Sequence, residues 1–285
     1  DPWSQNAFYY RPTRVHRRVD RFLERAVIKR ADRVVAVTEE IGHGLRELHP
    51  CLTLDRLSIL PHGYDPDDFP EEPALGPKDH ETFDLVHVGA FYGTRTPLPL
   101  FRALEALFKE RSDLGERIRV RLIGVTESDI LPFLSRFPLT RRVVEAPGHH
   151  SHPEAVTKMM EADVLLLITG DSKRTIPGKL YEYLAARRPL LALADEDGAH
   201  AQLIRRVNAG TVVAREDTNA IKSAVVKLYN EYRAGSSVSQ VQSEVLRRYS
   251  RKALVKKLCR LFDETLNESD STLEYPGQNR LYRNK

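Results

Sequence analysis

Lys179 and Glu182 have the types and the spacing to bind a charged ligand that carries hydroxyl groups. Residues 162–168 and 189–193 are short and almost continuously apolar, which predicts two buried parallel strands. Between them a turn at Gly178 opens a short helix that begins with Lys179 and has Glu182 one turn on. A helix N-terminus offers unpaired N–H groups and a positive dipole end to a phosphate. We therefore predict a site for a phosphorylated, hydroxyl-rich ligand at this point.

A second loop whose residues could bind a ligand follows another predicted strand, residues 84–88, and precedes a helix. Gly89 and Gly93 let the backbone approach a ligand, and Arg95 is placed to meet a diphosphate with its guanidinium fork. The loop is neither a GxGxxG nor a Walker sequence, so taken alone an ordinary strand-to-helix turn explains it equally well. Because the predicted phosphate-binding helix lies at the same edge of the sheet, ligand binding becomes the favoured interpretation.

Two further clusters contain residue types that can bind a metal ion. We interpret one as a helix start and the other as a capped turn. Residues 149–154 combine three histidines with a glutamate. Their spacing fits no closed zinc pattern, and Pro153 is typical of a helix start. Residues 65–68 could hold a cation through carboxylates, but Asp-Pro commonly opens a turn, here a capped 3₁₀ or helical turn. We expect no metal site.

The elements that must position these residues alternate between strand and helix after residue 83, which predicts a doubly wound, mostly parallel sheet. The predicted strands are residues 84–88, 118–123, 142–145, 162–168, 189–193 and 211–213. The predicted helices are residues 97–109, 129–137, 153–161, 177–186, 199–207, 219–233 and 250–265.

The sequence of the N-terminal part predicts a basic amphipathic helix at residues 14–30 and short strands near Arg33 and Leu57. Arginines fill the faces beside a stripe of apolar residues, namely Val15, Val19, Phe22, Leu23, Ala26 and Val27. One interpretation is a helix lying on anionic lipid. The favoured one is a packed helix with a solvated arginine face.

Composition limits the alternatives. The chain has 285 residues, 41% hydrophobic and 29% charged, which suits one large or two modest globular domains. Its 44 Lys and Arg against 40 Asp and Glu give a formal charge of +4, which does not call for a nucleic-acid partner. Cys51 and Cys259 have no metal-type spacing and favour a reduced, cytoplasmic setting. No apolar run is long enough to span a bilayer.

Five motifs resemble, in order and spacing, those of family-4-type GT-B glycosyltransferases. They are ADRVVAVT at 31–38, ILPHGYD at 59–65, GAFYGTR at 89–95, ADV at 162–164 and PGKLYEYLAA at 177–186. Together they cover roughly residues 1–265 and are far more specific than any one alone. The resemblance implies two Rossmann-like domains, with a nucleotide sugar held mainly by the second. It further implies glycosyl transfer with retention, without a cofactor and usually without a metal.

The resemblance also assigns roles to residues. Glu182 matches the glutamate that accepts the ribose hydroxyls, Arg95 matches a basic residue on the diphosphate, and Lys179 is a second contact; these three form the expected catalytic set. Gly148 and His149 fall where relatives face the nucleobase. The full donor-binding set is Gly89, Phe91, Gly93, Arg95, Gly148, His149, Pro177, Gly178, Lys179, Leu180 and Glu182.

Three positions depart from the family pattern. Arg174 stands where many relatives have a glutamate on the donor sugar, and Ala90 stands where many have a basic residue. Arg187 replaces the glycine that commonly ends the Glu182 helix. A non-glycine residue in a left-handed cap costs about 1 kcal/mol, so we expect a cap of different shape.

The resemblance predicts the domain organisation as well. Asp1-Pro2-Trp3 resembles a segment that some relatives carry midway through the acceptor domain, so we expect most of that domain to be absent. We predict an acceptor-domain remnant at 1–62, a donor-binding domain at 63–249, a helix crossing back at 250–266 and a disordered tail at 267–285.

The function expected from this resemblance is transfer of a sugar from a nucleotide-diphosphate sugar to an acceptor. The acceptor class stays open between a glycan, a lipid-linked molecule and a small molecule. Two alternatives are a non-catalytic nucleotide-sugar-binding module and a GT-B sugar-nucleotide epimerase. We expect a cytoplasmic protein, held at the inner face of the membrane if helix 14–30 lies on lipid.

Overall fold

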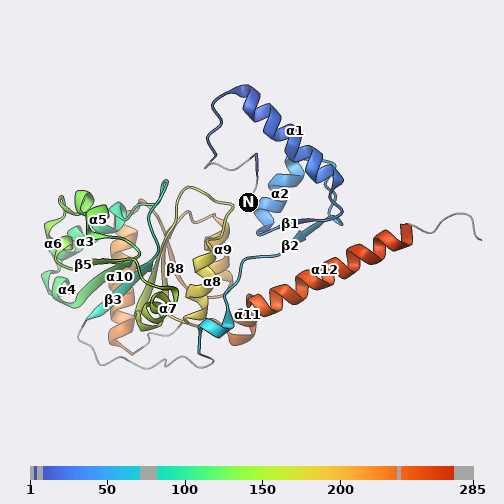
Figure 1. Cartoon of the computed structure of the whole chain (residues 1–285). Coiled ribbons are helices and arrows are strands. Elements are labelled where there is room, and N and C mark those ends of the chain that lie inside the picture. The colour runs from blue at the N-terminus through green and yellow to red at the C-terminus, as the bar shows by residue number, and fades with distance from the viewer. Residues whose placement is uncertain (1–2, 5–8, 71–81, 236–238, 273–285) are drawn as a thin grey trace, which may run out of the picture.

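A computed structural model describes residues 3–4, 9–70, 82–235 and 239–272 (Figure 1). Residues 71–81 and the last part of the predicted tail, 273–285, lie outside these ranges. The remainder of that tail, 267–272, was predicted to be disordered. That prediction is wrong, because α12 (Arg251–Thr272) is helical to its end at Thr272.

The larger sheet has six parallel strands in the order β5-β4-β3-β6-β7-β8, as a doubly wound fold requires. The strands are β3 (Phe83–Val88), β4 (Ile118–Ile123), β5 (Val144–Gly148), β6 (Val164–Ile168), β7 (Leu190–Ala194) and β8 (Gly210–Ala214). Side chains of β6 alternate between the two cores, Leu166 facing one and Leu165 and Leu167 the other. Both faces are covered, which explains why the strand is apolar throughout.

Helices cover both faces of this sheet (Figure 1). On one face pack α3 (Leu98–Glu110), α4 (Ser112–Arg117), α5 (Glu127–Leu134), α6 (Pro138–Arg141) and α10 (Thr218–Arg233). On the other pack α7 (His152–Glu161), α8 (Gly178–Ala185), α9 (Ala199–Arg206) and α11 (Ser243–Arg247). The predicted order of the strands is confirmed, and the predicted helices lie between them in the expected order, but α4 and α11 were not predicted.

Several element ends differ from the predictions. The helix predicted at 129–137 is two helices, because the chain turns before Pro138, which begins α6. The strand predicted at 142–145 begins at Val144 and continues to Gly148. Arg187, which follows α8, has φ +54°, so the left-handed cap expected to change shape is retained. Its guanidinium donates to Ser243 Oγ at 2.8 Å.

The front of the chain forms a separate two-stranded parallel sheet, β1 (Val34–Ala36) with β2 (Leu57–Ile59). The helix α2 (Glu39–Leu48) connects the two strands, and Thr38 caps it. Ile28 of α1 (Arg14–Arg30) packs into a small core with Ile41 and Leu52.

Two chain segments join this part to the larger sheet. The short 3₁₀ helix η1 (Pro66–Asp68) lies where Tyr64 pairs with Ser250, just before α12 begins. In Figure 1, α12 then runs beneath β1 and β2. Lys257 of α12 donates to the carbonyl oxygen of Ile59 at 2.8 Å, and Glu268 pairs with Arg33. The domain boundaries at 62 and 249 stay predictions.

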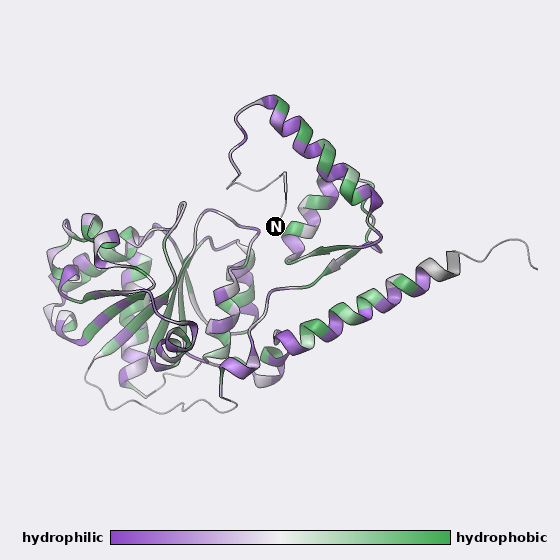
Figure 2. Cartoon of the chain, viewed as in Figure 1, coloured by the Kyte–Doolittle hydropathy of each residue, from purple (hydrophilic) through white to green (hydrophobic). Residues whose placement is uncertain are grey.

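The favoured interpretation of α1, with a packed apolar face, is wrong. Phe22 is 71% exposed and Val15 65%, and Figure 2 shows hydrophobic and hydrophilic residues alternating along α1. The buried residues of α1 are Glu24 and Ile28, which lie one turn apart on another face. The apolar stripe therefore has solvent over it in this chain.

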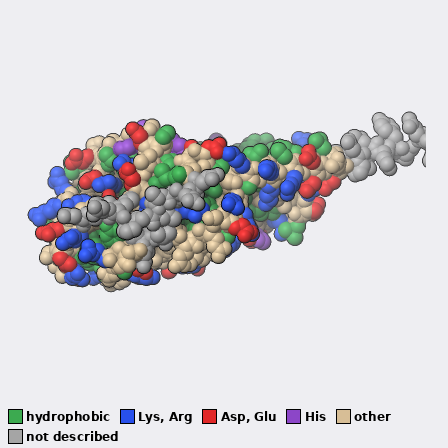
Figure 3. All heavy atoms as spheres, turned by 90° about the horizontal axis from the view of Figure 1, so that it is seen from below, with side chains coloured by type: hydrophobic (Ala, Val, Ile, Leu, Met, Phe, Trp, Pro, Cys, Tyr) green, Lys and Arg blue, Asp and Glu red, His purple; other side chains and the backbone are tan. Residues whose placement is uncertain are grey.

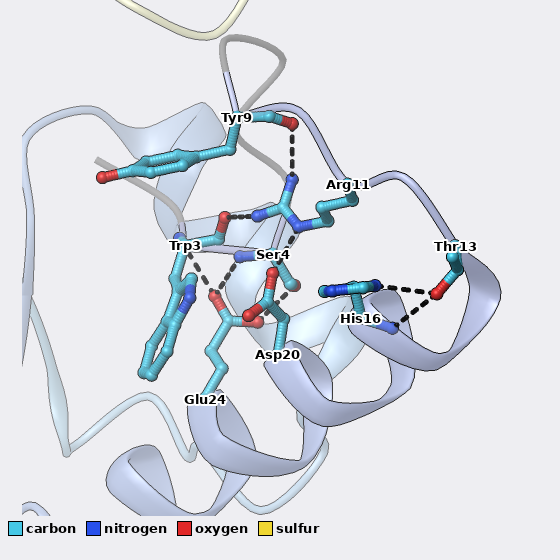
Figure 4. A network of polar contacts seen from close by, with 8 residues as sticks. All are labelled: Trp3, Ser4, Tyr9, Arg11, Thr13, His16, Asp20 and Glu24. Carbon is cyan, nitrogen blue, oxygen red and sulfur yellow. Dashed lines mark hydrogen bonds and ion pairs between the residues drawn. The ribbon is translucent and has the colours of Figure 1, made fainter.

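A polar network fills the packed side of α1 (Figure 4). Glu24 accepts from the backbone N–H groups of Trp3 and Ser4 at 3.1 and 3.0 Å, and its other oxygen lies 3.0 Å from His49 Nε2. Burial raises the pKa of Glu24, but hydrogen bonds from Ser4 and His49 outweigh it and hold the pKa below its usual value. Asp20 pairs with Arg11. Both acidic groups of the helix are therefore engaged within the chain.

None of the described helices is long and apolar enough to cross a membrane. Figure 3 views one face of the molecule, on which Lys and Arg side chains are mixed with Asp and Glu.

Candidate functional site

The candidate site lies where the strand order of the large sheet reverses, between β3 and β6. β3 pairs with β4 on one side and with β6 on the other. The loops that leave β3 and β6, residues 89–97 and 169–177, therefore meet at the carboxyl edge. Thr94 Oγ1 accepts a hydrogen bond from the Asp171 N–H at 3.0 Å. Open α/β sheets bind ligands at such a reversal.

Lys179 connects the two halves of this site. Its ammonium group donates to the carbonyl oxygen of Val88, the last residue of β3, at 2.7 Å. A Cβ atom on Gly89 would lie 2.6 Å from the same nitrogen, so a larger residue would displace the Lys179 side chain, and the φ of +112° at this position itself favours glycine. Burial first, and then Arg95, lowers the pKa of Lys179 to about 8, while Glu182 opposes the shift. The amine is thus charged at neutral pH, and a bound anion would stabilise that charge.

The N-terminus of α8 adds to this positive charge. Pro177 is the N-cap residue and gives no side-chain hydrogen bond to the helix. A Cβ atom on Gly178 would meet nothing within 4 Å, so the space above the first turn is open. Unpaired N–H groups that face such a space favour a bound anion.

Arg95 and Phe91 are fixed by aromatic contacts in the loop after β3. The guanidinium carbon of Arg95 lies 4.3 Å from the centre of the Tyr92 ring, a cation–π contact. Phe91 stacks on His87, with ring centres 4.7 Å apart and an interplanar angle of 15°. His87 is 1% exposed and its Nδ1 lies 2.9 Å from the carbonyl oxygen of Leu166. The ring therefore joins β3 and β6 beneath the loop.

His87 is uncharged at this position. Burial first, and then Lys179, lowers the pKa of His87 to about 3. A neutral ring adds no charge to the site, so its part is structural support for Phe91. The sequence predictions missed it, although a histidine within an otherwise buried strand was a usable signal.

Glu182 is half-buried one turn into α8. Burial raises the pKa of Glu182, and nearby charges on His152, Arg251 and Lys179 oppose that shift. His152 Nε2 in turn lies 3.0 Å from Asp68 Oδ2. The carboxylate is thus close enough to Lys179, His152 and Asp68 to feel their charges, and such a polar surface suits hydroxyl groups.

The remaining predicted residues lie farther along the edge. Gly148 ends β5, and its carbonyl oxygen accepts from the Gly124 N–H at 2.8 Å. A Cβ atom on Gly124 would come within 3.2 Å of Gly89 Cα, so the ends of β3, β4 and β5 form one glycine-lined floor. His149 is exposed beyond that floor. Arg174 is exposed in the loop after β6.

The two clusters interpreted as local structure take ordinary roles. His150 and His152 contact different partners, the carbonyl oxygen of Gly148 and the carboxylate of Asp68. Asp65 caps η1 by accepting from the Asp67 N–H at 3.1 Å, so the predicted capped turn is confirmed. In the described ranges, no group of three or more His, Cys, Asp or Glu side chains could hold a metal ion.

Comparisons with known proteins bear on the architecture. No protein-family model matches the sequence, and no curated protein matches it either. Solved structures do match. Sucrose-phosphate synthase from Thermosynechococcus elongatus gives a TM-score of 0.70 at 16% identity, over 88% of this chain and 62% of that protein. The chain thus spans less than two thirds of that relative's length.

Two further structures agree. HepE of Anabaena, solved with UDP, gives a TM-score of 0.70 at 13% identity, over 92% of this chain and 70% of HepE. WaaG, a glycosyltransferase involved in lipopolysaccharide biosynthesis, gives a TM-score of 0.64 at 19% identity, over 88% of this chain and 69% of WaaG. The chain has the GT-B fold. At these identities the likeness concerns the fold alone.

The two sheets of the chain differ in size. The Rossmann-like architecture of the GT-B fold is represented here by a six-stranded sheet and by a second sheet of two strands. The candidate site lies at the carboxyl edge of the six-stranded sheet, on the loops after β3 and β6 and the first turns of α8. Arg95, Lys179 and Glu182 are brought to this one edge, as predicted from the motifs, while their roles stay predictions.

Proposed function

We propose that this chain is the donor-binding part of a glycosyltransferase that uses a nucleotide-diphosphate sugar. The observation that carries the proposal is the geometry of Lys179, whose amine joins the first turn of α8 to the end of β3 beside Gly89. In a GT-B fold this geometry supplies a cation and open N–H groups to a diphosphate. HepE and TarM have been solved with UDP, which makes UDP the first nucleotide to test.

The proposed chemistry follows from charge. When the bond between sugar and diphosphate breaks, negative charge develops on the leaving phosphate. Lys179 and Arg95 would stabilise that charge in a site that burial has already made less polar. Glu182 would hold the ribose through its hydroxyl groups and so fix the nucleotide beside both cations. We extend the proposal to transfer with retention and without a metal ion.

Titration calorimetry with UDP, GDP and ADP, paired with a turnover assay on the same sample, tests the proposal. We expect one of the three to bind, and a matching nucleotide sugar to be consumed when an acceptor is supplied. Binding without turnover would favour the non-catalytic module, and a changed sugar released without an acceptor would favour an epimerase. If none of the three nucleotides binds, the proposed site is wrong.

We further propose that α1 holds the protein on the anionic inner face of a membrane. Its exposed apolar stripe of Val15, Val19, Phe22, Leu23 and Val27 lies beside a basic row. That row consists of Arg14, Arg18, Arg21, Arg25 and Lys29, all exposed. Since Asp20 and Glu24 are engaged internally, the free face is cationic and apolar together, which suits an anionic lipid surface.

Co-sedimentation with vesicles tests this surface. We expect binding to phosphatidylglycerol vesicles that weakens with salt and is lost in Phe22→Glu, whereas pure phosphatidylcholine vesicles leave the protein in solution. Self-association of the chain without lipid binding would overturn the proposal.

A further inference from the structure

The loop after β6 is bonded to the smaller, two-stranded part of the chain through one hydroxyl group. Thr38 Oγ1 donates to the carbonyl oxygen of Arg174 at 2.6 Å, across 136 residues of sequence. The same oxygen accepts from the Ile41 N–H at 3.2 Å and so caps α2. Thr38 is 4% exposed. Both hydrogen-bonding capacities of this hydroxyl are therefore used, one within its own helix and one across the fold.

The helix that carries Thr38 is firmly held. A Cβ atom on Gly42 of α2 would come within 3.0 Å of a Leu57 methyl group, so helix and strand β2 pack closely. At the other end of α2, His49 bonds to the buried Glu24 of α1 at 3.0 Å. Thr38 is thus presented from a rigid position.

The loop that accepts this hydrogen bond, through the carbonyl oxygen of Arg174, leads into the candidate site. The Ala199 N–H donates to the carbonyl oxygen of Lys173 at 2.8 Å, and Asp171 bonds to Thr94. Arg174 lies between these attachments and the residues Thr175 to Pro177, which precede the open first turn of α8. Its carbonyl fixes the direction from which the chain enters that turn.

The hydrogen bond between Thr38 and Arg174 is not part of a closely packed interface. Beside it lies a cavity of about 250 Å³ between the two parts of the chain, lined among others by Glu39, Ile59, Ile176, Gln202 and Arg206. With open space next to it, the loop depends on specific bonds more than on close packing for its position.

We propose that Thr38 is a positioning residue that holds residues 172–176 in place from the opposite part of the fold. The inference rests on the proposed function for its meaning. In a glycosyltransferase this loop would lie beside the bound sugar, and Thr38 would make its conformation depend on how the two parts are docked. The smaller part would then contribute to the donor site without touching the donor.

Three substitutions separate the two roles of the hydroxyl. Thr38→Ser keeps both hydrogen bonds. Thr38→Asp keeps an acceptor for the Ile41 N–H, and so keeps the cap, but a carboxylate cannot donate to Arg174. Thr38→Val has the same shape as threonine and loses both bonds.

Backbone order parameters from NMR of the ligand-free chain provide the readout. For residues 172–176 we expect values near those of a rigid backbone, about 0.85, in the natural chain and in Thr38→Ser. In Thr38→Asp and Thr38→Val they should fall toward about 0.6, the range of flexible backbone. Residues 39–48 of α2 should stay rigid in Thr38→Asp, which excludes a general loss of structure.

UDP affinity, measured alongside, distinguishes this inference from the proposed function. We expect UDP still to bind Thr38→Asp, because Arg95, Lys179 and Glu182 are untouched. Unchanged order parameters at 172–176 in both Thr38→Asp and Thr38→Val would overturn the positioning role, whatever UDP does. Should Thr38→Asp fail to fold, the comparison of Thr38→Val with Thr38→Ser decides in the same way. Absence of UDP binding in the natural chain would count against the proposed function alone.

Discussion

The ammonium group of Lys179 lies 2.7 Å from the carbonyl oxygen of Val88, so the first turn of α8 is bonded to the end of β3. This contact joins two segments that are 91 residues apart and sets a cation at the reversal point of the sheet. Tyr183, one turn on, supports the same strand end, since its hydroxyl accepts from the Val88 N–H at 2.8 Å. The candidate site is thus built around a strand terminus held by two side chains of one helix.

Nucleotide binding should depend on pH through Lys179. Its pKa, lowered to about 8 by burial and Arg95, means that the amine is charged below that pH and neutral above it. UDP prefers the charged form, so affinity should be constant near pH 7 and fall as the pH rises through 8 to 9. Titrations in Lys179→Arg, which stays charged, should show no such fall. An equal fall in both proteins would assign the dependence to another group.

Glu182→Ala should weaken UDP binding by about 1.5–3 kcal/mol, the range for hydrogen bonds to a charged partner. The reason is loss of the acceptor for the ribose hydroxyls. Calorimetry with 2′,3′-dideoxy-UDP supplies the control, because that nucleotide lacks both hydroxyls and should bind the natural chain and the variant equally. A difference that persists with the dideoxy compound would show that Glu182 acts through the fold.

Arg95→Ala should reduce UDP affinity while leaving the weaker affinity for uridine almost unchanged, because the guanidinium is expected to contact only the diphosphate. Arg102→Ala is the matched control, since that arginine is exposed on the neighbouring helix α3. Equal losses for UDP and uridine in Arg95→Ala would mean that the Tyr92–Arg95 contact supports the loop and not the ligand.

Gly178→Ala should raise stability and lower UDP affinity together. No atom lies within 4 Å of the added methyl group, and removing glycine from a helix stabilises by about 0.4–1 kcal/mol through the unfolded chain. A diphosphate seated on the first turn would meet that methyl group, and we expect affinity to fall at least tenfold. Gly115→Ala in α4, away from the site, should leave UDP affinity unchanged. If affinity is retained in Gly178→Ala, the ligand does not lie on this turn.

Much of this architecture was predictable from the sequence for physical reasons. β6 and β7 are buried on both faces, so their sequences are apolar throughout and can be recognised as buried strands. Chain order then places Gly89, Lys179 and Glu182 at one edge, because parallel strands share their carboxyl ends. Element ends were less predictable where a proline divides a helix, as at Pro138.

Other features depend on contacts that no local pattern reveals. The spacing of Val15, Val19 and Phe22 predicts an amphipathic helix, but not whether anything covers it. The sequence shows a histidine within a buried strand, but the role of His87 depends on Leu166 and Phe91, whose positions are set by strand pairing and by a loop. The link between Thr38 and Arg174 joins two parts of the chain whose relative position the sequence does not encode locally.

The central claim is that a nucleoside diphosphate binds at the first turn of α8, against the end of β3. NMR of the ¹⁵N-labelled chain titrated with UDP, and with GDP and ADP in parallel, tests it most directly. We predict that the largest amide shifts occur at Gly178, Lys179 and Leu180, together with Gly89. Saturable binding whose shifts leave these four amides unmoved and cluster elsewhere would contradict the account.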